Sequence, residues 1–261
     1  MLNDFSVIVR RFDSAIKIAC ISDVHYGALE HMEKEWSTFI DRVIADPNLY
    51  LILNGDLINN NTRSSVGSPW DDIVRPREQK KRMVEFLEPI KNRILCCTSG
   101  NHERRSMKDA DDDPTYDIMT KLNLEDLYRQ NAAFMKIQLG KHDTKTDKVN
   151  VAYHFAVTHG AGGGIYTGAT VNRNERWGNT IDGVDCIVVG HTHKGAVTRP
   201  AKLVFDPYHN IVTLKDYLVI SCVAWQRYAE YPLQKMMLPT ATGNPQILHL
   251  SDKQKYIEAR W

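Results

Sequence analysis

Short apolar runs alternate with helix-like segments through the first two-thirds of the chain, and this alternation constrains the fold more than any other feature. Five runs are typical of buried strands, namely residues 15–23, 49–56, 93–102, 149–160 and 184–193. The segments 29–46 and 73–91 separate the first three runs, and their large apolar side chains recur at the spacing of one helix face. Strands that are joined through helices pair in parallel, so the pattern predicts the α/β class.

Other segments predict further helices and strands. Their patterns are helical at 115–130 and 170–181, and typical of strands at 133–140 and 246–250. A polar hairpin connection is expected at 141–148, and two or three antiparallel strands between 195 and 225 predict a second sheet. Because no break in composition divides the chain, we expect a single domain over 1–261. Its core would span about 16–195, followed by antiparallel strands and a tail at 196–261.

The composition excludes several classes of protein. Hydrophobic residues make up 43% of the chain and charged residues 25%, which is sufficient for a packed core and argues against disorder. The formal net charge is +1, so charge alone gives no reason to expect nucleic acid or a membrane as partner. No apolar run approaches the roughly 18 residues of a membrane helix. The five cysteines lie in apolar runs without metal-site spacing, which predicts reduced core thiols and a cytoplasmic protein.

Polar residues follow each of the five buried runs at the point where the strand should end. They are Asp23 and His25, then Asp56, then Asn101 and His102, then His159, and finally His191 and His193. In an open α/β sheet, sites form at the carboxyl ends of the strands, so these side chains are expected at one edge. Each short motif alone is typical of a helix cap or a turn. The conjunction of five motifs, each at a strand end, indicates a functional site.

The residue types point to metal chemistry. Carboxylates, an amide oxygen and imidazoles suit Mn²⁺, Fe, Zn²⁺ or Ni²⁺ better than Ca²⁺. The set is too large for one tetrahedral ion, and paired ions about 3.5–4 Å apart are the usual device for displacement at phosphorus. The Asp-x-His and His-x-His spacings are expected to turn both side chains the same way on an extended chain.

The segments DVHYG, GDLIN, GNHE, THG and GHTH, in this order, resemble the five motifs of the calcineurin-like metallophosphoesterase superfamily over residues 16–195. The resemblance implies a four-layer α/β/β/α sandwich of two mixed sheets flanked by helices, with a dinuclear site at the sheet edge. It also implies the ligands of two divalent ions. One ion would take Asp23, His25, Asp56 and His193, and the other Asp56, Asn101, His159 and His191. Asp56 would bridge them.

The same resemblance implies a mechanism. Two divalent ions, with Mn²⁺ expected and Fe, Zn²⁺ or Ni²⁺ as alternatives, would activate a hydroxide that attacks phosphorus in line. His102 would serve as general acid or as hydrogen-bond donor to the leaving oxygen, and Glu103 would have a supporting role. His154 lies on the same expected strand as His159 and competes with it as ligand. We expect His159, because it stands at the strand end before a glycine.

The substrate is harder to predict. GNHE followed by Arg104 and Arg105 resembles the protein phosphatase branch, yet GDLINNN lacks the arginine that this branch has in its second motif. GHTH is closer to the phosphodiesterase and nuclease branches. We expect hydrolysis of phosphodiester bonds in a nucleotide or nucleic acid, with Arg104, Asn59 and Arg63 binding substrate and no membrane partner. The alternatives are a phosphomonoesterase or protein phosphatase, and a non-catalytic scaffold.

Two further segments leave alternatives open. Residues 73–105 carry nine Lys or Arg and four Glu, which is typical of a solvated helix face or of a patch that binds phosphates. The aromatic residues of 225–231 either pack in the protein or stack on a base.

Overall fold

The computed structural model describes residues 5–63, 65, 70, 72–141, 151–229, 233 and 236–261. The connection that we expected at 141–148 lies outside the described residues, apart from Lys141.

The first six-stranded sheet carries the N-terminal strand-helix alternation. In spatial order its strands are β14 (Ile257–Arg260), β13 (Ile247–Leu250), β2 (Ile16–Ile21), β3 (Leu49–Asn54), β4 (Ile94–Thr98) and β5 (Tyr128–Arg129). The pairs β2–β3, β3–β4 and β4–β5 are parallel, as the alternation predicts, whereas β13 runs antiparallel to β2. The central strands are buried on both faces, which explains their unbroken apolar runs.

The second six-stranded sheet gathers strands from the whole chain. In spatial order they are β1 (Val7–Phe12), β6 (Ala132–Leu139), β7 (Val151–Thr158), β8 (Cys186–Val189), β12 (Leu218–Ser221) and β9 (Ala196–Thr198). The expectation that the late strands form their own antiparallel sheet is therefore wrong in part. β12 pairs in parallel with β8. All four residues of β12 are buried, so the strand needs cover on both faces, and the interior position beside β8 supplies it.

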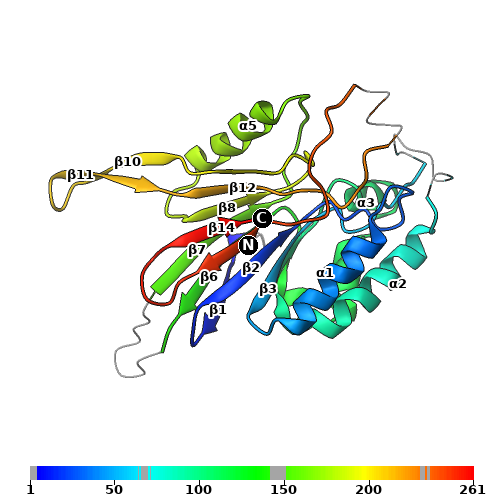
Figure 1. Ribbon diagram of the computed structural model, residues 1–261, viewed down its shortest axis with the longest axis horizontal. Coiled ribbons are helices and arrows are strands. Elements are labelled where there is room, and N and C mark those ends of the chain that lie inside the picture. Colours follow the sequence, from blue (N-terminus) through cyan, green and yellow to red (C-terminus); the bar gives the residue numbers. More distant parts are fainter. Residues whose placement is uncertain are drawn as a thin grey trace.

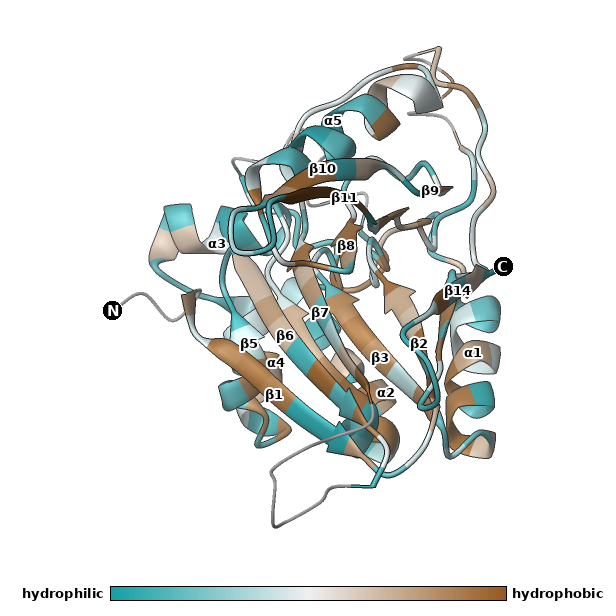
Figure 2. Ribbon diagram, turned by 90° about the vertical axis from the view of Figure 1, so that its left-hand side faces the viewer, coloured by the Kyte–Doolittle hydropathy of each residue, from teal (hydrophilic) through white to brown (hydrophobic). Residues whose placement is uncertain are grey.

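Helices cover the outer face of each sheet (Figures 1 and 2). α1 (Glu33–Ala45), α2 (Pro76–Leu87) and α4 (Pro114–Lys121) lie on the side of the first sheet, and α5 (Thr167–Thr180) lies on the second. The α/β class and the four-layer arrangement of two mixed sheets between helices are confirmed. No helix among the described residues is both long and apolar enough to span a membrane.

The helix expected over 115–130 is wrong in length. α4 ends at Lys121, and a 3-10 helix (Glu125–Leu127) and β5 follow it. Asn123 has a left-handed backbone with φ of 59°, which stops the helix. The described chain also contains three elements that the patterns did not predict, namely β1, β14 and the polar helix α3 (Glu103–Ala110). A second 3-10 helix (Glu88–Arg93) continues α2.

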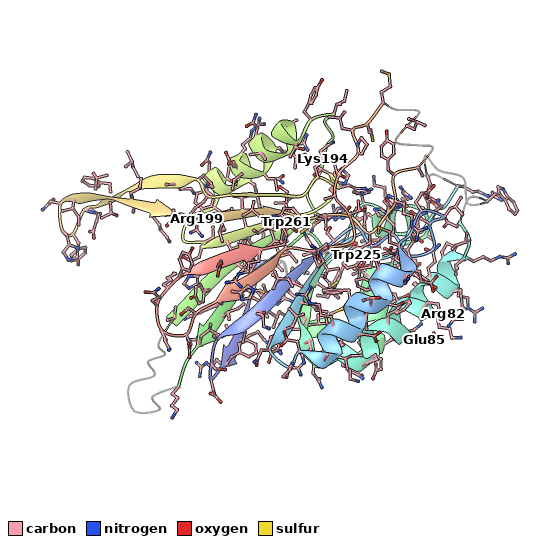
Figure 3. All side chains as sticks on the ribbon, in the orientation of Figure 1. Arg82, Glu85, Lys194, Arg199, Trp225 and Trp261 are labelled. Atoms are coloured by element: carbon pink, nitrogen blue, oxygen red, sulfur yellow. The ribbon has the colours of Figure 1, made fainter. Side chains whose placement is uncertain are left out.

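The core lies between the sheets and beneath α1 and α2. Trp225 is fully buried, and its ring meets that of Trp36 edge-on with centroids 5.0 Å apart. Packing, rather than stacking on a substrate base, is therefore the role of Trp225 (Figure 3). All five cysteines are buried and free, as predicted, and they lie in or beside the central strands.

A two-stranded hairpin projects from the second sheet (Figure 1). Its strands are β10 (Ala201–Asp206) and β11 (Ile211–Asp216), which pair with each other in register. The cross-strand pairs Leu203–Leu214 and Phe205–Val212 place four exposed apolar side chains on one face of the hairpin.

Candidate metal centre

Five strands end at one edge of the sandwich, and the polar residues that follow them meet there. β2 leads to Asp23 and His25, β3 to Asp56, and β4 to Asn101, while β7 and β8 lead to the remaining histidines. The structure brings together every side chain that we expected to bind metal, namely Asp23, His25, Asp56, Asn101, His159, His191 and His193.

The backbone at this edge is strained. Five non-glycine residues of the cluster have φ between 48° and 71°, namely Asp23, His25, Asp56, His191 and His193. A left-handed backbone costs roughly 1–2 kcal/mol per non-glycine residue and is concentrated at functional sites. The side chains therefore converge because the strands end in tight left-handed turns. Our expectation that Asp-x-His and His-x-His alternate along an extended chain is wrong.

One group of ligand atoms surrounds Asp23. Its Oδ1 lies 3.2 Å from His193 Nε2 and 3.8 Å from His25 Nε2. The Nε2 atoms of His25 and His193 are 3.1 Å apart. His25 Nε2 is also 3.8 Å from Asp56 Oδ2, which connects this group to the next one.

A second group surrounds Asn101. Its Oδ1 lies 3.0 Å from His159 Nε2 and 2.6 Å from His191 Nδ1. Asp56 Oδ2 is 3.2 Å from the same His159 nitrogen. The other ring nitrogen of His159, Nδ1, donates to the carbonyl of Asn54 at 2.8 Å, which turns Nε2 toward the cluster. Asp56 thus stands between the two groups, where a bridging carboxylate belongs.

The cluster attracts positive charge. Asp23 Oδ1 is buried without a hydrogen-bond partner among the described residues. Burial favours the neutral carboxyl, yet the neighbouring histidines hold the pKa of Asp23 well below its usual value. Burial likewise opposes a charge on His159, but the charge of Asp56 raises its pKa to about 10. Two buried carboxylates, an amide oxygen and four imidazoles that converge at one edge are a donor set that fits a pair of divalent ions.

The comparisons agree with this geometry. The family model of the calcineurin-like phosphoesterases matches residues 16–195. The chain belongs to this family. Its members hydrolyse phosphoric ester bonds and use a dinuclear centre of divalent metal ions. In this chain the Asp and His side chains form three groups whose ligand atoms lie close enough together to hold a metal ion.

Solved structures of similar chains are distant. They include a predicted phosphoesterase from Streptococcus pneumoniae, at 10% identity and a TM-score of 0.37, covering 95% of this chain and 100% of that chain. YfkN, a calcineurin-like phosphoesterase from Bacillus subtilis, has 12% identity and a TM-score of 0.37, and the match covers 95% of this chain and 91% of that chain. A metallophosphoesterase from Sphaerobacter thermophilus has 13% sequence identity and a TM-score of 0.39, and the match covers 94% of this chain and 89% of that chain. No curated protein matches this chain.

His102 lies at the side of the phosphoesterase centre. Its ring meets that of His25 edge-on at 4.3 Å, and its Nε2 is 3.9 Å from Asp56 Oδ2. Its Nδ1 donates to the carbonyl of Asn59 at 2.7 Å, so Nε2 accepts from Arg105 Nη2 at 3.0 Å. Burial lowers the pKa of His102 to about 3, although the charge of Asp56 opposes this. The imidazole is therefore neutral in this arrangement, and the adjacent donor is the Arg105 guanidinium.

The three residues expected to bind substrate do not hydrogen-bond to the cluster with their side chains. Arg104 donates to the carbonyl of Gln130 at 3.1 Å, and the Asn59 amide donates to Asp72 at 2.7 Å. Arg63 lines a surface hollow with Ser106. The neighbouring Arg105 is the arginine that hydrogen-bonds to His102.

Four of the nine basic residues at 73–105 form ion pairs with acidic neighbours. On α2, Arg82 pairs with Glu78 and Glu85 at 3.2 and 3.1 Å. Figure 3 shows Arg82 and Glu85 on the outer side of the helix. Lys80 is held by Asp117 at 2.7 Å. This half of the stretch is a solvated helix face, and a patch that binds phosphates along α2 is not supported.

Glu103 supports the turns that carry the cluster, in agreement with the role expected from the sequence. Its Oε2 accepts the backbone N–H groups of Asp56 and Gly100 at 3.0 and 2.9 Å. Its Oε1 accepts those of Leu57 and Ile58 at 2.7 and 3.2 Å. Burial and the charge of Asp56 raise the pKa of Glu103 to about 7, against the effect of the donated N–H groups. One side chain thus holds the turns after β3 and β4 together.

Gly100 allows these two turns to approach closely. A Cβ atom at Gly100 would lie 2.0 Å from Asp56 Oδ1 and 2.2 Å from the Asp56 backbone nitrogen. We expect Gly100→Ala to cost about 2 kcal/mol of stability, as overpacking does, and to lower the affinity for divalent ions by displacing Asp56. Gly168→Ala on α5, where a Cβ would meet nothing within 4 Å, is the matched control. Thermal unfolding with and without added Mn²⁺ measures both effects, and equal behaviour of the two variants would contradict the steric argument.

Proposed function

We propose that this metal-dependent phosphoesterase hydrolyses phosphodiester bonds in a nucleotide or nucleic acid substrate. The observation that carries the proposal is that one guanidinium contacts His102, beside the expected metal ligands. Arg105 donates a hydrogen bond to His102, whose ring packs against that of His25. A diester phosphate carries one negative charge and a monoester phosphate up to two, so a single guanidinium matches the diester better.

The turn after β3 supports the same conclusion. Three asparagines occupy the part of the second motif where the protein phosphatase branch has an arginine. The Nδ2 groups of Asn59 and Asn61 both donate to Asp72 Oδ1 at 2.7 Å, and that of Asn60 donates to the carbonyl of His102 at 2.9 Å. These amides build the turn and add no charge for a phosphate dianion.

The residues would divide the work as follows. Asp23, His25, Asp56 and His193 would hold one divalent ion, and Asp56, Asn101, His159 and His191 the other. When bound, the ions lower the pKa of water and neutralise charge that develops on the phosphoryl oxygens. We expect Mn²⁺, with Fe, Zn²⁺ or Ni²⁺ as alternatives. Arg105 would donate to the leaving oxygen, and His102, whose Nε2 accepts a hydrogen bond from Arg105, would position the guanidinium.

The test compares two chromogenic substrates in the presence of Mn²⁺. We expect hydrolysis of bis-p-nitrophenyl phosphate to exceed that of p-nitrophenyl phosphate by about tenfold or more in kcat/KM. Asp56→Asn should abolish both activities, because it removes the bridging carboxylate. A preference for the monoester would overturn the diesterase proposal in favour of a phosphomonoesterase or protein phosphatase. No turnover by metal-loaded protein would instead favour a non-catalytic scaffold.

A further inference from the structure

A glycine-rich loop at 160–164 follows His159 and leads to α5, and two cationic side chains hold it. Lys194 Nζ donates to the carbonyl of Gly164, and Arg173 Nη2 donates to that of Gly163 at 2.5 Å. The two carbonyls belong to consecutive residues, so both cations are tied to the same short stretch of the loop. Lys194 directly follows His193, and Figure 3 places it between the start of α5 and the segment near residue 240. Two expected metal ligands are thus chain neighbours of this contact: His159 directly precedes the loop, and His193 directly precedes Lys194.

These cations lack an acidic partner. Lys194 is only 7% exposed, and no carboxylate among the described residues forms an ion pair with it or with Arg173. Arg173 Nη1 is buried and has no hydrogen-bond partner in the described chain. Lys80, which is also partly buried, is by contrast paired with Asp112 and Asp117. Partly buried charges that are held by neutral carbonyls alone are unfavourable unless an anion joins them.

We propose that Lys194 and Arg173 bind a second phosphate group of the substrate, next to the phosphoryl group that is hydrolysed at the metal centre. The inference rests on the proposed function and specifies its substrate as a phosphoester with at least one further phosphate. Phosphate oxygens are stronger acceptors for ammonium and guanidinium groups than peptide carbonyls. The bound phosphate would replace the carbonyls of Gly163 and Gly164. A Cβ at Gly163 would meet nothing within 4 Å, so this glycine borders open space.

The first test measures binding without catalysis. Pyrophosphate is titrated into protein that has been stripped of metal with EDTA and dialysed, and the heat gives Kd. Lys194→Gln keeps an N–H donor for the Gly164 carbonyl but removes the charge, so it separates binding of an anion from support of the loop. We expect Lys194→Gln and Arg173→Gln each to raise Kd by about tenfold, and Lys194→Arg to stay within about threefold of the wild type.

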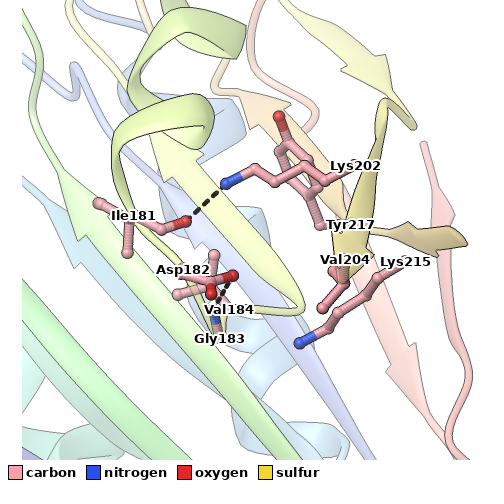
Figure 4. A pocket seen from close by; sticks show the side chains of 8 residues that line it. All are labelled: Ile181, Asp182, Gly183, Val184, Lys202, Val204, Lys215 and Tyr217. Carbon is pink, nitrogen blue, oxygen red and sulfur yellow. Dashed lines mark hydrogen bonds between the residues drawn. The ribbon is translucent and has the colours of Figure 1, made fainter. Parts of the chain in front are cut away.

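Lys202→Gln is the matched control. Lys202 Nζ donates to the carbonyl of Ile181 at 2.9 Å, and its ammonium lies over the ring of Tyr217 (Figure 4). It is thus another lysine tied to a carbonyl, but beyond the opposite end of α5. We expect this variant to bind pyrophosphate as the wild type does. An unchanged Kd in Lys194→Gln, or an equal loss in Lys202→Gln, would overturn the proposal.

The second test uses the Mn²⁺-loaded enzyme and two substrates. They are the 5′-(p-nitrophenyl phosphate) esters of thymidine with and without a 3′-phosphate. We expect the wild type and Lys202→Gln to prefer the ester with the 3′-phosphate, and Lys194→Gln to lose this preference. Hydrolysis without any preference would overturn the inference while the diesterase proposal stands. If neither ester is hydrolysed, the diesterase proposal fails, and the pyrophosphate titration still decides whether the cation pair binds an anion.

Discussion

Glu103→Ala should lower the melting temperature of the protein by roughly 10 °C. The substitution leaves the buried N–H groups of Asp56, Leu57, Ile58 and Gly100 without their acceptor. Each unsatisfied buried donor costs about 1 kcal/mol or more, so the sum is about 4 kcal/mol. In a protein of this size 1 kcal/mol corresponds to roughly 2–4 °C. Calorimetric or circular-dichroism melting measures the change.

Two controls make the result interpretable. Glu103→Gln keeps one acceptor oxygen and turns an NH₂ group toward the remaining donors, so we expect about half of the loss. Glu78→Ala removes a carboxylate on α2 that is 43% exposed and forms only surface ion pairs, so its effect should stay within about 0.5 kcal/mol. If the melting temperatures of Glu103→Ala and Glu78→Ala differed by less than about 2 °C, Glu103 would not hold together the turns after β3 and β4.

His159→Ala should abolish stabilisation by divalent ions. An ion that binds only the folded protein at a large excess over Kd raises the melting temperature by roughly 5–10 °C. His159 Nε2 faces both Asp56 and Asn101, so its removal breaks one group of ligand atoms. Even residues that only orient metal ligands contribute about 10–100-fold to affinity, and we expect a loss above about 100-fold here. Melting curves with increasing Mn²⁺ give the apparent affinity, and hydrolysis of the diester substrate should disappear in parallel.

His154→Ala is the matched control from the same strand. His154 lies five residues earlier on β7, its side chain is 40% exposed, and its Nδ1 is 3.1 Å from Asp185 Oδ2. This variant should lose little stability and keep the full response to Mn²⁺. A normal response in His159→Ala, or loss of the response in His154→Ala, would show that the wrong histidine of β7 has been assigned to the centre.

Much of the fold follows from local patterns. β2, β3, β4 and β8 are mostly apolar because both of their faces are covered. In β7 the burial alternates over the first four residues, and the second half is apolar and buried up to Val157. β1 was not predicted, because it is an edge strand without a continuous apolar run. Exposed and covered residues alternate along its six positions. The polar helix α3 has too few apolar residues for a recognisable face.

The missed helix explains why Arg105, rather than Arg104, contacts His102. His102 and Arg105 are three residues apart at the start of α3, so they lie on the same face and their side chains meet. Arg104 is turned by about 100° from its neighbour on the helix and reaches Gln130. Without knowing that residues 103–110 are helical, the sequence offers no reason to choose between two adjacent arginines.

The sequence by itself determined the strand-helix alternation, the family and the set of polar residues at the strand ends. These are local properties, since a buried strand must be apolar and its ligands must follow it directly. Only the tertiary structure decided that β12 lies beside β8, that Glu103 joins two turns, and that Lys194 and Arg173 meet at one loop. These contacts join residues far apart in the chain, and no local pattern encodes them because their geometry exists only after the sheets have packed.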